Sequence, residues 1–195
     1  MKITGGYLKG RTLFYNKKPE LRPTRGIVKK AIFDMLAPYI SHSRILELFA
    51  GTGAIGFEAL SRGAESVVFV DNNVRSIKLL EKNCKFLDVK ERVRIVKTDA
   101  QHALTKFQKK HMKFDMIFAD PPYHLSFEKI QGMISTAVSV LVDGGFFVLE
   151  SAKIKKLFED LQVSGFVKIK EKVYGSTRVQ IYQKRTADCC ISRKF

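Results

Sequence analysis

The sequence is poor in cysteine and in acidic residues, and it contains no long apolar run. The three cysteines among its 195 residues lack metal-ligand spacing and form no disulfide framework, which argues against structural zinc and indicates a reducing compartment. No apolar run approaches the roughly 20 residues of a membrane-spanning helix, and residues 1–6 lack a signal-peptide core. We therefore expect a cytoplasmic monomer with no metal site and no membrane contact.

The excess of positive charge lies at the two ends of the chain. The formal net charge is +16, from 35 Lys and Arg against 19 Asp and Glu. It divides into +8 for residues 1–44, +1 for 45–150 and +7 for 151–195. A polyanion bound by both ends around a nearly neutral centre would explain this distribution. A solvated, lysine-rich surface is the alternative.

Apolar runs alternate with amphipathic segments from residue 44 onward, and this alternation predicts an α/β fold with a doubly wound, mostly parallel sheet. The expected strands are 44–49, 66–70, 93–96, 114–119, 146–149, 166–174 and 179–183. The expected helices are 54–62, 74–87, 100–110, 127–141 and 153–161. The last two strands flank a Gly-Ser-Thr turn, which predicts an antiparallel hairpin at or near the sheet edge.

The N-terminal region has a different pattern, so we expect residues 1–43 to form a basic extension, 44–184 the main domain and 185–195 a polar tail. Residues 1–15 predict short strands around a Gly-Gly turn. Residues 24–37 predict a helix that Pro38 helps to stop. We expect its apolar face to include Ile27, with Lys29 outside that face.

A glycine-rich segment follows the first strand of the alternating region. Glu47 precedes it, and Gly51, Thr52 and Gly53 lead into a helix, which is the context of a nucleotide-binding loop. Glycines let the backbone pass close to a ligand because no Cβ intervenes. An acid at position 47 would repel a pyrophosphate but suits an amino group or a sulfonium. The segment therefore indicates S-adenosylmethionine.

Two acidic residues follow the next two strands. Asp71 lies 20 residues after Gly51, where a ribose-binding acid belongs, although with Asn72 it could instead begin a helix. Asp99 could accept a hydrogen bond from an adenine amine beside the backbone of Ala100, or it could be an N-cap. Both alternatives stay open at the level of the sequence.

A rigid acidic segment, Asp120-Pro121-Pro122-Tyr123, follows the strand expected at 114–119. Consecutive prolines fix the backbone and remove two N–H donors. A strand end does not otherwise need such rigidity. The Asp120 carboxylate and the Pro121 carbonyl could each accept one N–H of a target amine, while Tyr123 stacks on its ring. This arrangement would aim the nitrogen lone pair at an activated methyl group, so catalysis would be positioning and electrostatics.

The chain resembles the bacterial 16S rRNA guanine-N2 methyltransferase family, one of the amino-methyltransferases that share the Asp-Pro-Pro-Tyr signature. The resemblance runs from about residue 5 to residue 182. It rests on the segments Gly5-Gly6, Lys9-Gly10-Arg11, Arg22-Pro23-Thr24, Leu48 to Gly56, Glu58 to Ala64, Val70-Asp71 with Asn83, Asp120 to Tyr123, and Tyr174-Gly175. The family usually has Asp where this chain has Glu47.

The resemblance implies a Rossmann-like class I methyltransferase fold and methylation of one guanine in 16S rRNA, and we expect this rRNA to be bound within a small-subunit assembly particle. It also implies that Arg22-Pro23-Thr24 lies over the cofactor and the target. The residues that we expect to act on the guanine are Asp120, Pro121 and Tyr123. Those expected to bind S-adenosylmethionine are Glu47, Phe49, Gly51, Thr52, Gly53, Asp71, Asn72, Asp99, Ala100, Arg22 and Thr24. Those expected to bind RNA are Lys9, Arg11, Arg25, Lys29, Lys30 and Arg178.

Three other functions fit part of the sequence. A DNA adenine-N6 or cytosine-N4 methyltransferase would use the same Asp-Pro-Pro-Tyr segment, but no inserted target-recognition segment is visible. A nicotinamide-dependent oxidoreductase would share the glycine loop, but such an enzyme has no use for the Asp-Pro-Pro-Tyr segment. A non-catalytic RNA-binding factor could keep the fold, although the acids at 47, 71 and 120 argue against it.

Overall fold

The computed structural model describes residues 1–15, 24–122, 124–152 and 164–186, and the side chains of Thr24 and Arg25 lie outside this description. The strands are β1 Arg44–Leu48, β2 Ser66–Asp71, β3 Val93–Lys97, β4 Phe114–Ala119, β5 Leu141–Ala152, β6 Phe166–Tyr174 and β7 Thr177–Lys184. The helices are α1 Thr24–Ile40, α2 Ala54–Ser61, α3 Val74–Leu87, α4 Ala100–Lys109 and α5 Phe127–Val140, with a 3-10 turn at Lys90–Arg92. None of these helices is long and apolar enough to cross a bilayer.

The strands form one sheet in the order β3-β2-β1-β4-β5-β7-β6. The first five pair in parallel, whereas β7 runs antiparallel to both β5 and β6. The predicted doubly wound sheet with an antiparallel hairpin is therefore confirmed. The strand order reverses between β1 and β4, and ligands of such sheets bind at the carboxyl ends of the strands at this point.

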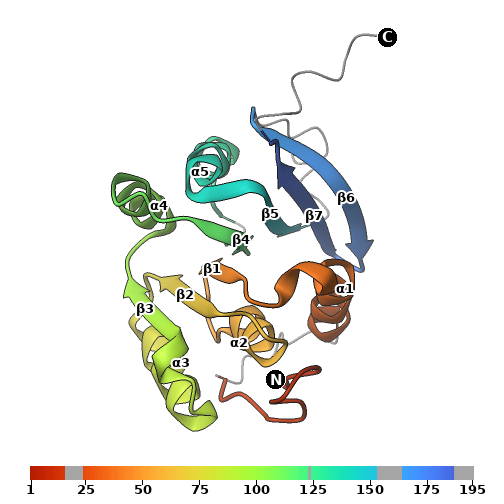
Figure 1. The fold of residues 1–195 in the computed structure, drawn as a ribbon, viewed down its shortest axis with the longest axis vertical. Helices are drawn as coiled ribbons and strands as arrows, with labels where there is room; N and C mark the ends of the chain where they lie inside the picture. The colour runs from red at the N-terminus through yellow and green to blue at the C-terminus, as the bar shows by residue number, and fades with distance from the viewer. Residues whose placement is uncertain (16–23, 123, 153–163, 187–195) are drawn as a thin grey trace.

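Helices cover both faces of the sheet, and each face has its own apolar core (Figure 1). On one face, α1, α2 and α3 pack against the sheet together with apolar residues of the N-terminal segment 1–15. On the other face, α4 and α5 pack alone among the described helices. The strand residues between them read as nearly continuous apolar runs because both faces are buried.

The register of the parallel strands sets up one row of residues at their carboxyl ends. Leu48 of β1 pairs with Val70 of β2 and with Ala119 of β4, which in turn pairs with Leu149 of β5. The next residue in the chain is Phe49 after Leu48, Asp71 after Val70, Asp120 after Ala119 and Glu150 after Leu149. Polar and glycine-loop residues from four strands therefore meet along one edge of the sheet.

Three expectations for the N-terminal region are wrong. Residues 1–15 form turns with a single antiparallel bridge between Lys2 and Thr12, because Gly6 and Gly10 turn the chain at positive φ. Helix α1 runs past Pro38 to Ile40. The buried stripe of α1 is also rotated relative to the prediction, because Ile27 is exposed while Lys29 is buried against α2.

The start of β5 also differs from the prediction. The strand begins at Leu141, directly after α5, and the Asp143-Gly144-Gly145 turn lies inside it. The pairing with β4 shifts there, because Phe114 pairs with Leu141 while Met116 pairs with Phe146. Gly144 adopts a φ of 74°, which lets the extra residues bulge out of the ladder. The helix expected at 153–161 lies outside the described residues.

Candidate active site

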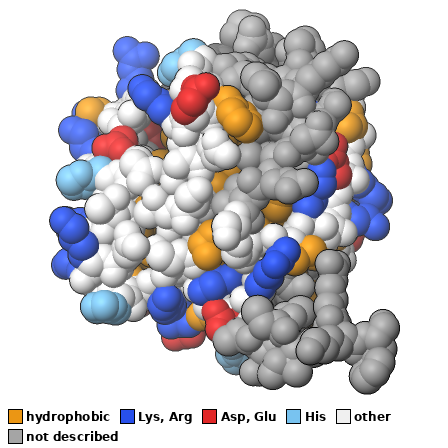
Figure 2. Space-filling view, turned by 90° about the horizontal axis from the view of Figure 1, so that it is seen from above, with side chains coloured by type: hydrophobic (Ala, Val, Ile, Leu, Met, Phe, Trp, Pro, Cys, Tyr) orange, Lys and Arg blue, Asp and Glu red, His pale blue; other side chains and the backbone are white. Residues whose placement is uncertain are grey.

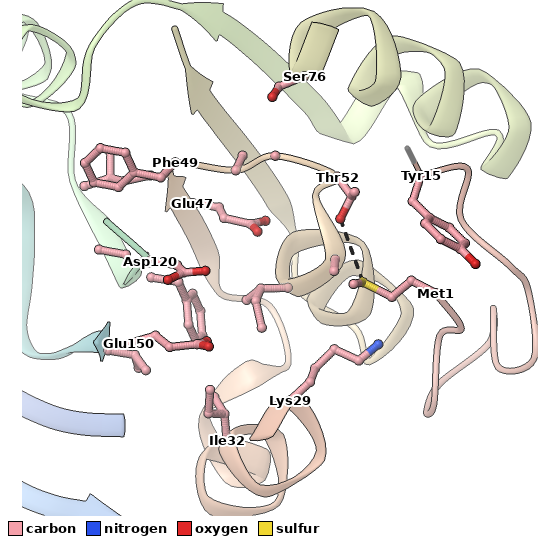
Figure 3. Close-up of a pocket in the computed structure, with 18 of the residues that line it drawn as sticks. Met1, Tyr15, Lys29, Ile32, Glu47, Phe49, Thr52, Ser76, Asp120 and Glu150 are labelled. Atoms are coloured by element: carbon pink, nitrogen blue, oxygen red, sulfur yellow. Dashed lines mark hydrogen bonds between the residues drawn. The ribbon is translucent and has the colours of Figure 1, made fainter. Parts of the chain in front are cut away.

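A cavity of about 740 Å³ lies at the carboxyl ends of β1, β4 and β5. Its other walls are formed by the glycine loop, which is residues 49–53 after β1, and by the start of α3. Parts of α1 and of the N-terminal segment complete them. Figure 3 shows Glu47, Asp120 and Glu150 reaching into it from neighbouring strands. Three acidic side chains around one cavity favour a ligand that carries positive charge and hydrogen-bond donors.

The glycine loop is held open by its own backbone and by Asp71. Gly51 and Gly53 have φ values of 55° and 74°, and a Cβ at Gly53 would lie 2.6 Å from the Phe57 ring. The backbone N–H of Gly51 donates to a carboxylate oxygen of Asp71 at 2.8 Å. The loop is therefore tied to the end of β2 by a hydrogen bond within the protein.

Glu47 is the most unusual titratable group of the cavity. It is buried, and one carboxylate oxygen accepts a hydrogen bond from the N–H of Gly56 at 2.7 Å. Burial raises the pKa of Glu47 to about 8, and the negative charge of Asp120 adds to the rise against the opposing effect of backbone hydrogen bonds. The raised pKa favours the protonated form of this carboxyl group near neutral pH, and a bound cation would favour its ionised form.

The segment after β4 places Asp120 on the cavity wall, where the strand ends. Pro121 is buried behind it, and the carbonyl of Pro122 accepts a hydrogen bond from the N–H of Leu125 at 2.9 Å. Tyr123 lies outside the described residues. The rigid backbone thus fixes the position from which Asp120 faces the cavity.

The predicted cofactor residues separate into two groups. Glu47, Phe49, Gly51 and Thr52 line the cavity, and Gly53 lies directly behind them at the N-terminus of α2. Four other residues do not line it: Asp71, Asn72, Asp99 and Ala100. Asp99 serves as the N-cap of α4, because its carboxylate accepts the N–H of His102 at 2.8 Å. Arg22 lies outside the described residues, as does the side chain of Thr24.

Lys29 lines the cavity but is not a free surface cation. Its ammonium lies 2.6 Å from a carboxylate oxygen of Glu58 and donates to the carbonyl of Lys2 at 2.7 Å. Glu58 is fully buried and also accepts hydrogen bonds from Thr4 and Arg62. The expected RNA contact by Lys29 is therefore replaced by a buried ion pair, which joins α1, α2 and the N-terminal segment.

Replacing Glu58 with Gln should lower the free energy of unfolding by about 3–5 kcal/mol, because the Lys29 ammonium would stay buried without its counter-charge. Urea unfolding at pH 7 measures this change. As a control, Asp34→Asn removes an exposed pair with Lys30 and should change stability by less than about 0.5 kcal/mol. A loss below about 1 kcal/mol for Glu58→Gln would contradict the assigned ion pair.

This stabilisation should also depend on pH. Burial raises the pKa of Glu58, but hydrogen bonds from Lys29 and Thr4 outweigh burial and hold it below the ordinary value of 4.5. The ion pair therefore contributes fully above about pH 4.5, and its contribution is lost as the pH falls through the lowered pKa.

The other predicted RNA-binding residues occupy different environments. Lys9, Arg11 and Lys30 are exposed, whereas Arg178 is buried with its Nε 3.1 Å from a Glu171 oxygen, so its expected surface contact is not supported. The side chain of Arg25 lies outside the described residues. Figure 2 shows Lys and Arg side chains scattered around one face rather than gathered into a single patch.

Several cavity residues were not predicted from the sequence. Glu150 lies inside β5, at the same edge as Asp120, and it directly follows the strand expected at 146–149, so that position was an available signal. Met1 and Tyr15 reach the cavity from the N-terminal segment, and the Thr52 hydroxyl lies 3.8 Å from the Met1 sulfur (Figure 3). No local pattern marks these two, because they reach the cavity through long-range contacts such as that of Met1 with Thr52, 51 positions away.

The strand order, the glycine loop after β1 and the acidic Pro-Pro segment after β4 together define a Rossmann-like class I methyltransferase. The chain belongs to the family described as Conserved hypothetical protein 95, whose model matches residues 1–183.

Two curated relatives and one solved structure are similar over nearly their whole length. A Bacillus subtilis protein named "Putative rRNA methyltransferase YlbH" is 37% identical over 185 residues, 95% of this chain and 100% of its own. The Haemophilus influenzae "Ribosomal RNA small subunit methyltransferase D" is 31% identical and covers 94% of this chain and 93% of its own. The structure titled "Putative methyltransferase yhhF from Escherichia coli" matches with a TM-score of 0.81 at 29% identity, covering 95% of this chain and 98% of that one.

Proposed function

We propose that this protein transfers the methyl group of S-adenosylmethionine to the exocyclic N2 amine of a guanine in 16S rRNA. The observation that carries this proposal is the meeting of Glu47, the glycine loop and Asp120 around one cavity. The names of the relatives, which include rRNA and small-subunit rRNA methyltransferases, support rRNA as the substrate.

The residues present fit the cofactor. A cavity of about 740 Å³ lies within the usual range of ligand sites, roughly 300–1,000 Å³. Glu47 would hold the positively charged amino group, and the backbone around Gly51 would lie against the rest of the molecule. Asp71 ends β2 and Asp99 caps α4, so in this proposal the ribose and the adenine would extend past the cavity lining toward these two acids. Arg22 and Thr24 remain proposed cofactor contacts. When bound, S-adenosylmethionine supplies a methyl group activated by its sulfonium.

The protein's own part in the reaction is to hold the target amine. The amine of guanine is a poor nucleophile because its lone pair is delocalised into the ring. We assign the Asp120 carboxylate and the Pro121 carbonyl as acceptors of its two N–H groups, with Tyr123 stacked on the base. Held in this way, the nitrogen directs its lone pair toward the methyl group, and no dedicated base is needed before transfer.

We further propose that the substrate is an assembling small-subunit particle in the cytoplasm and that the enzyme acts as a monomer. The described residues form one sheet with its covering helices and no added RNA-binding module. Ribosomal proteins would then help to place the guanine in the cavity.

Transfer of tritiated methyl groups tests the proposal directly. The purified protein is incubated with labelled cofactor and with stripped small subunits, naked 16S rRNA or duplex DNA, and the modified base is identified after digestion. We expect N2-methylguanine from the small-subunit samples and no label in DNA. Label in adenine or cytosine of DNA would establish the rival activity, and no transfer to any substrate would leave an RNA-binding factor.

A further inference from the structure

Two phenylalanine rings lie exposed beside the cavity. Phe14 of the N-terminal segment and Phe86 of α3 are 37% and 41% exposed, and their ring centroids are 5.1 Å apart in an edge-to-face arrangement. Isolated exposed apolar residues are ordinary, but a paired and ordered aromatic surface offers stacking area to a ligand.

A positively charged side chain lies over each ring in a cation–π contact. The Arg11 guanidinium lies 4.7 Å from the centroid of Phe86, and the Lys82 ammonium lies 3.8 Å from that of Phe14. Arg11 is also fixed in place, because it donates to the backbone carbonyl of Phe86 at 2.9 Å. We call these four residues, Arg11, Phe14, Lys82 and Phe86, the aromatic platform. Rings alternating with cations match the bases and phosphates of a nucleic-acid strand.

A buried asparagine ties the aromatic platform to the cofactor loop. The Asn83 amide accepts the N–H of Phe14 at 2.7 Å and donates to the carbonyls of Phe14 at 3.0 Å and Thr52 at 3.2 Å. Asn83 is fully buried. The platform is therefore held at a fixed position relative to the glycine loop.

The aromatic platform also continues the wall of the cavity. Tyr15 follows Phe14 in the chain and lines the cavity, and Ser76 lines it from α3 (Figure 3). Leu79 of α3 also lines it. Phe86 lies seven residues beyond Leu79 on the same helix, about 10 Å further along the axis. That separation corresponds to about three stacked bases of a strand.

We propose that the aromatic platform binds single-stranded RNA next to the target guanine, with bases stacked on Phe14 and Phe86 and phosphates on Arg11 and Lys82. This inference rests on the proposed function, because it extends the same substrate beyond the cavity. Single-stranded nucleotides fit better than a duplex, since only unpaired bases present their faces to rings. Cation contacts to exposed rings are weak, so an incoming base can replace them.

Fluorescence anisotropy with a labelled single-stranded RNA of about 12 nucleotides tests the proposal. The Phe14→Leu and Phe86→Leu variants keep apolar packing but remove the ring, and each should weaken RNA binding by about 5- to 100-fold. Phe14→Tyr should bind like the wild type. Calorimetry with S-adenosylmethionine should give unchanged affinity for all variants, which shows that the fold and the cofactor site are intact.

The control is Tyr39→Leu, which removes a ring that is 53% exposed on α1, next to a different cavity formed by Ser41, Asp143 and Phe146. It should leave RNA affinity unchanged. Equal RNA binding by wild type, Phe14→Leu and Phe86→Leu would overturn the proposal. So would normal oligonucleotide binding combined with a loss of activity only on protein-containing subunits, since the surface would then contact a ribosomal protein. If the wild type binds RNA through these rings but methylates no rRNA, the proposed function fails, and the aromatic platform is then an RNA-binding surface without an adjacent methylation target.

Discussion

Replacing Asp120 with Asn or Ala should lower the rate of methyl transfer by about 10²- to 10³-fold. The substitution removes the charged acceptor that we assign to the target amine, while the loop backbone and the glycine loop stay in place. Cofactor affinity should not fall. It should change little, because the loss of the Asp120 charge weakens the attraction for a cation while the resulting fall in the pKa of Glu47 strengthens it.

Single-turnover methylation of small subunits gives the rate, and calorimetry gives the cofactor affinity. Asp143→Asn is a matched control, because Asp143 is an exposed acid near the start of β5 that pairs with Lys184 at 3.0 Å. The control should retain the full rate. A normal rate in Asp120→Asn would remove Asp120 from the catalytic assignment, and lost cofactor binding would move it to the cofactor site.

Affinity for S-adenosylmethionine should rise about tenfold per unit between pH 6 and pH 8 and then level off. The pKa of Glu47 is about 8 in the protein alone, so the carboxyl group must lose a proton when it binds the cationic amino group. Calorimetry in two buffers with different ionisation heats should detect this proton release at pH 7. A pH-independent affinity would mean that Glu47 does not face the cationic group.

The Glu47→Gln variant separates binding from stability. It should weaken cofactor binding by about 10- to 100-fold at pH 8, because a hydrogen bond to a charged acceptor is lost. Its empty form should be more stable than the wild type at pH 8. The pKa of folded Glu47 lies above its ordinary value of 4.5, so wild-type stability declines as the pH rises from about 4.5 to about 8.

Thermal unfolding of the empty proteins at pH 5 and pH 8 measures this trade-off. The variant should lack the wild-type decline between these pH values, with each kcal/mol corresponding to about 2–4 °C in Tm. Equal pH dependence of the two proteins would show that Glu47 titrates normally.

Local patterns were enough to predict most of the sheet. The apolar run 44–49 and the glycines after it indicated a buried strand and a nucleotide loop, and the structure places a strand at 44–48 with the glycine loop after it. The prediction was wrong where a distant partner decides the outcome. The sequence predicted Lys29 as a surface residue of α1, yet it is buried because its ammonium forms an ion pair with Glu58 of α2. The bulge in β5 likewise depends on its pairing with β4.

The sequence by itself determined the order of strands and helices and placed acidic and glycine residues at strand ends, because periodicity and turn residues act over a few neighbouring positions. Tertiary structure alone decided that Leu48, Val70, Ala119 and Leu149 align in one row, so that the residues after them share an edge. It also brought Tyr15 to the cavity and set Phe14 against Phe86. These contacts join residues far apart in the chain, and only the packing of the whole fold brings them together.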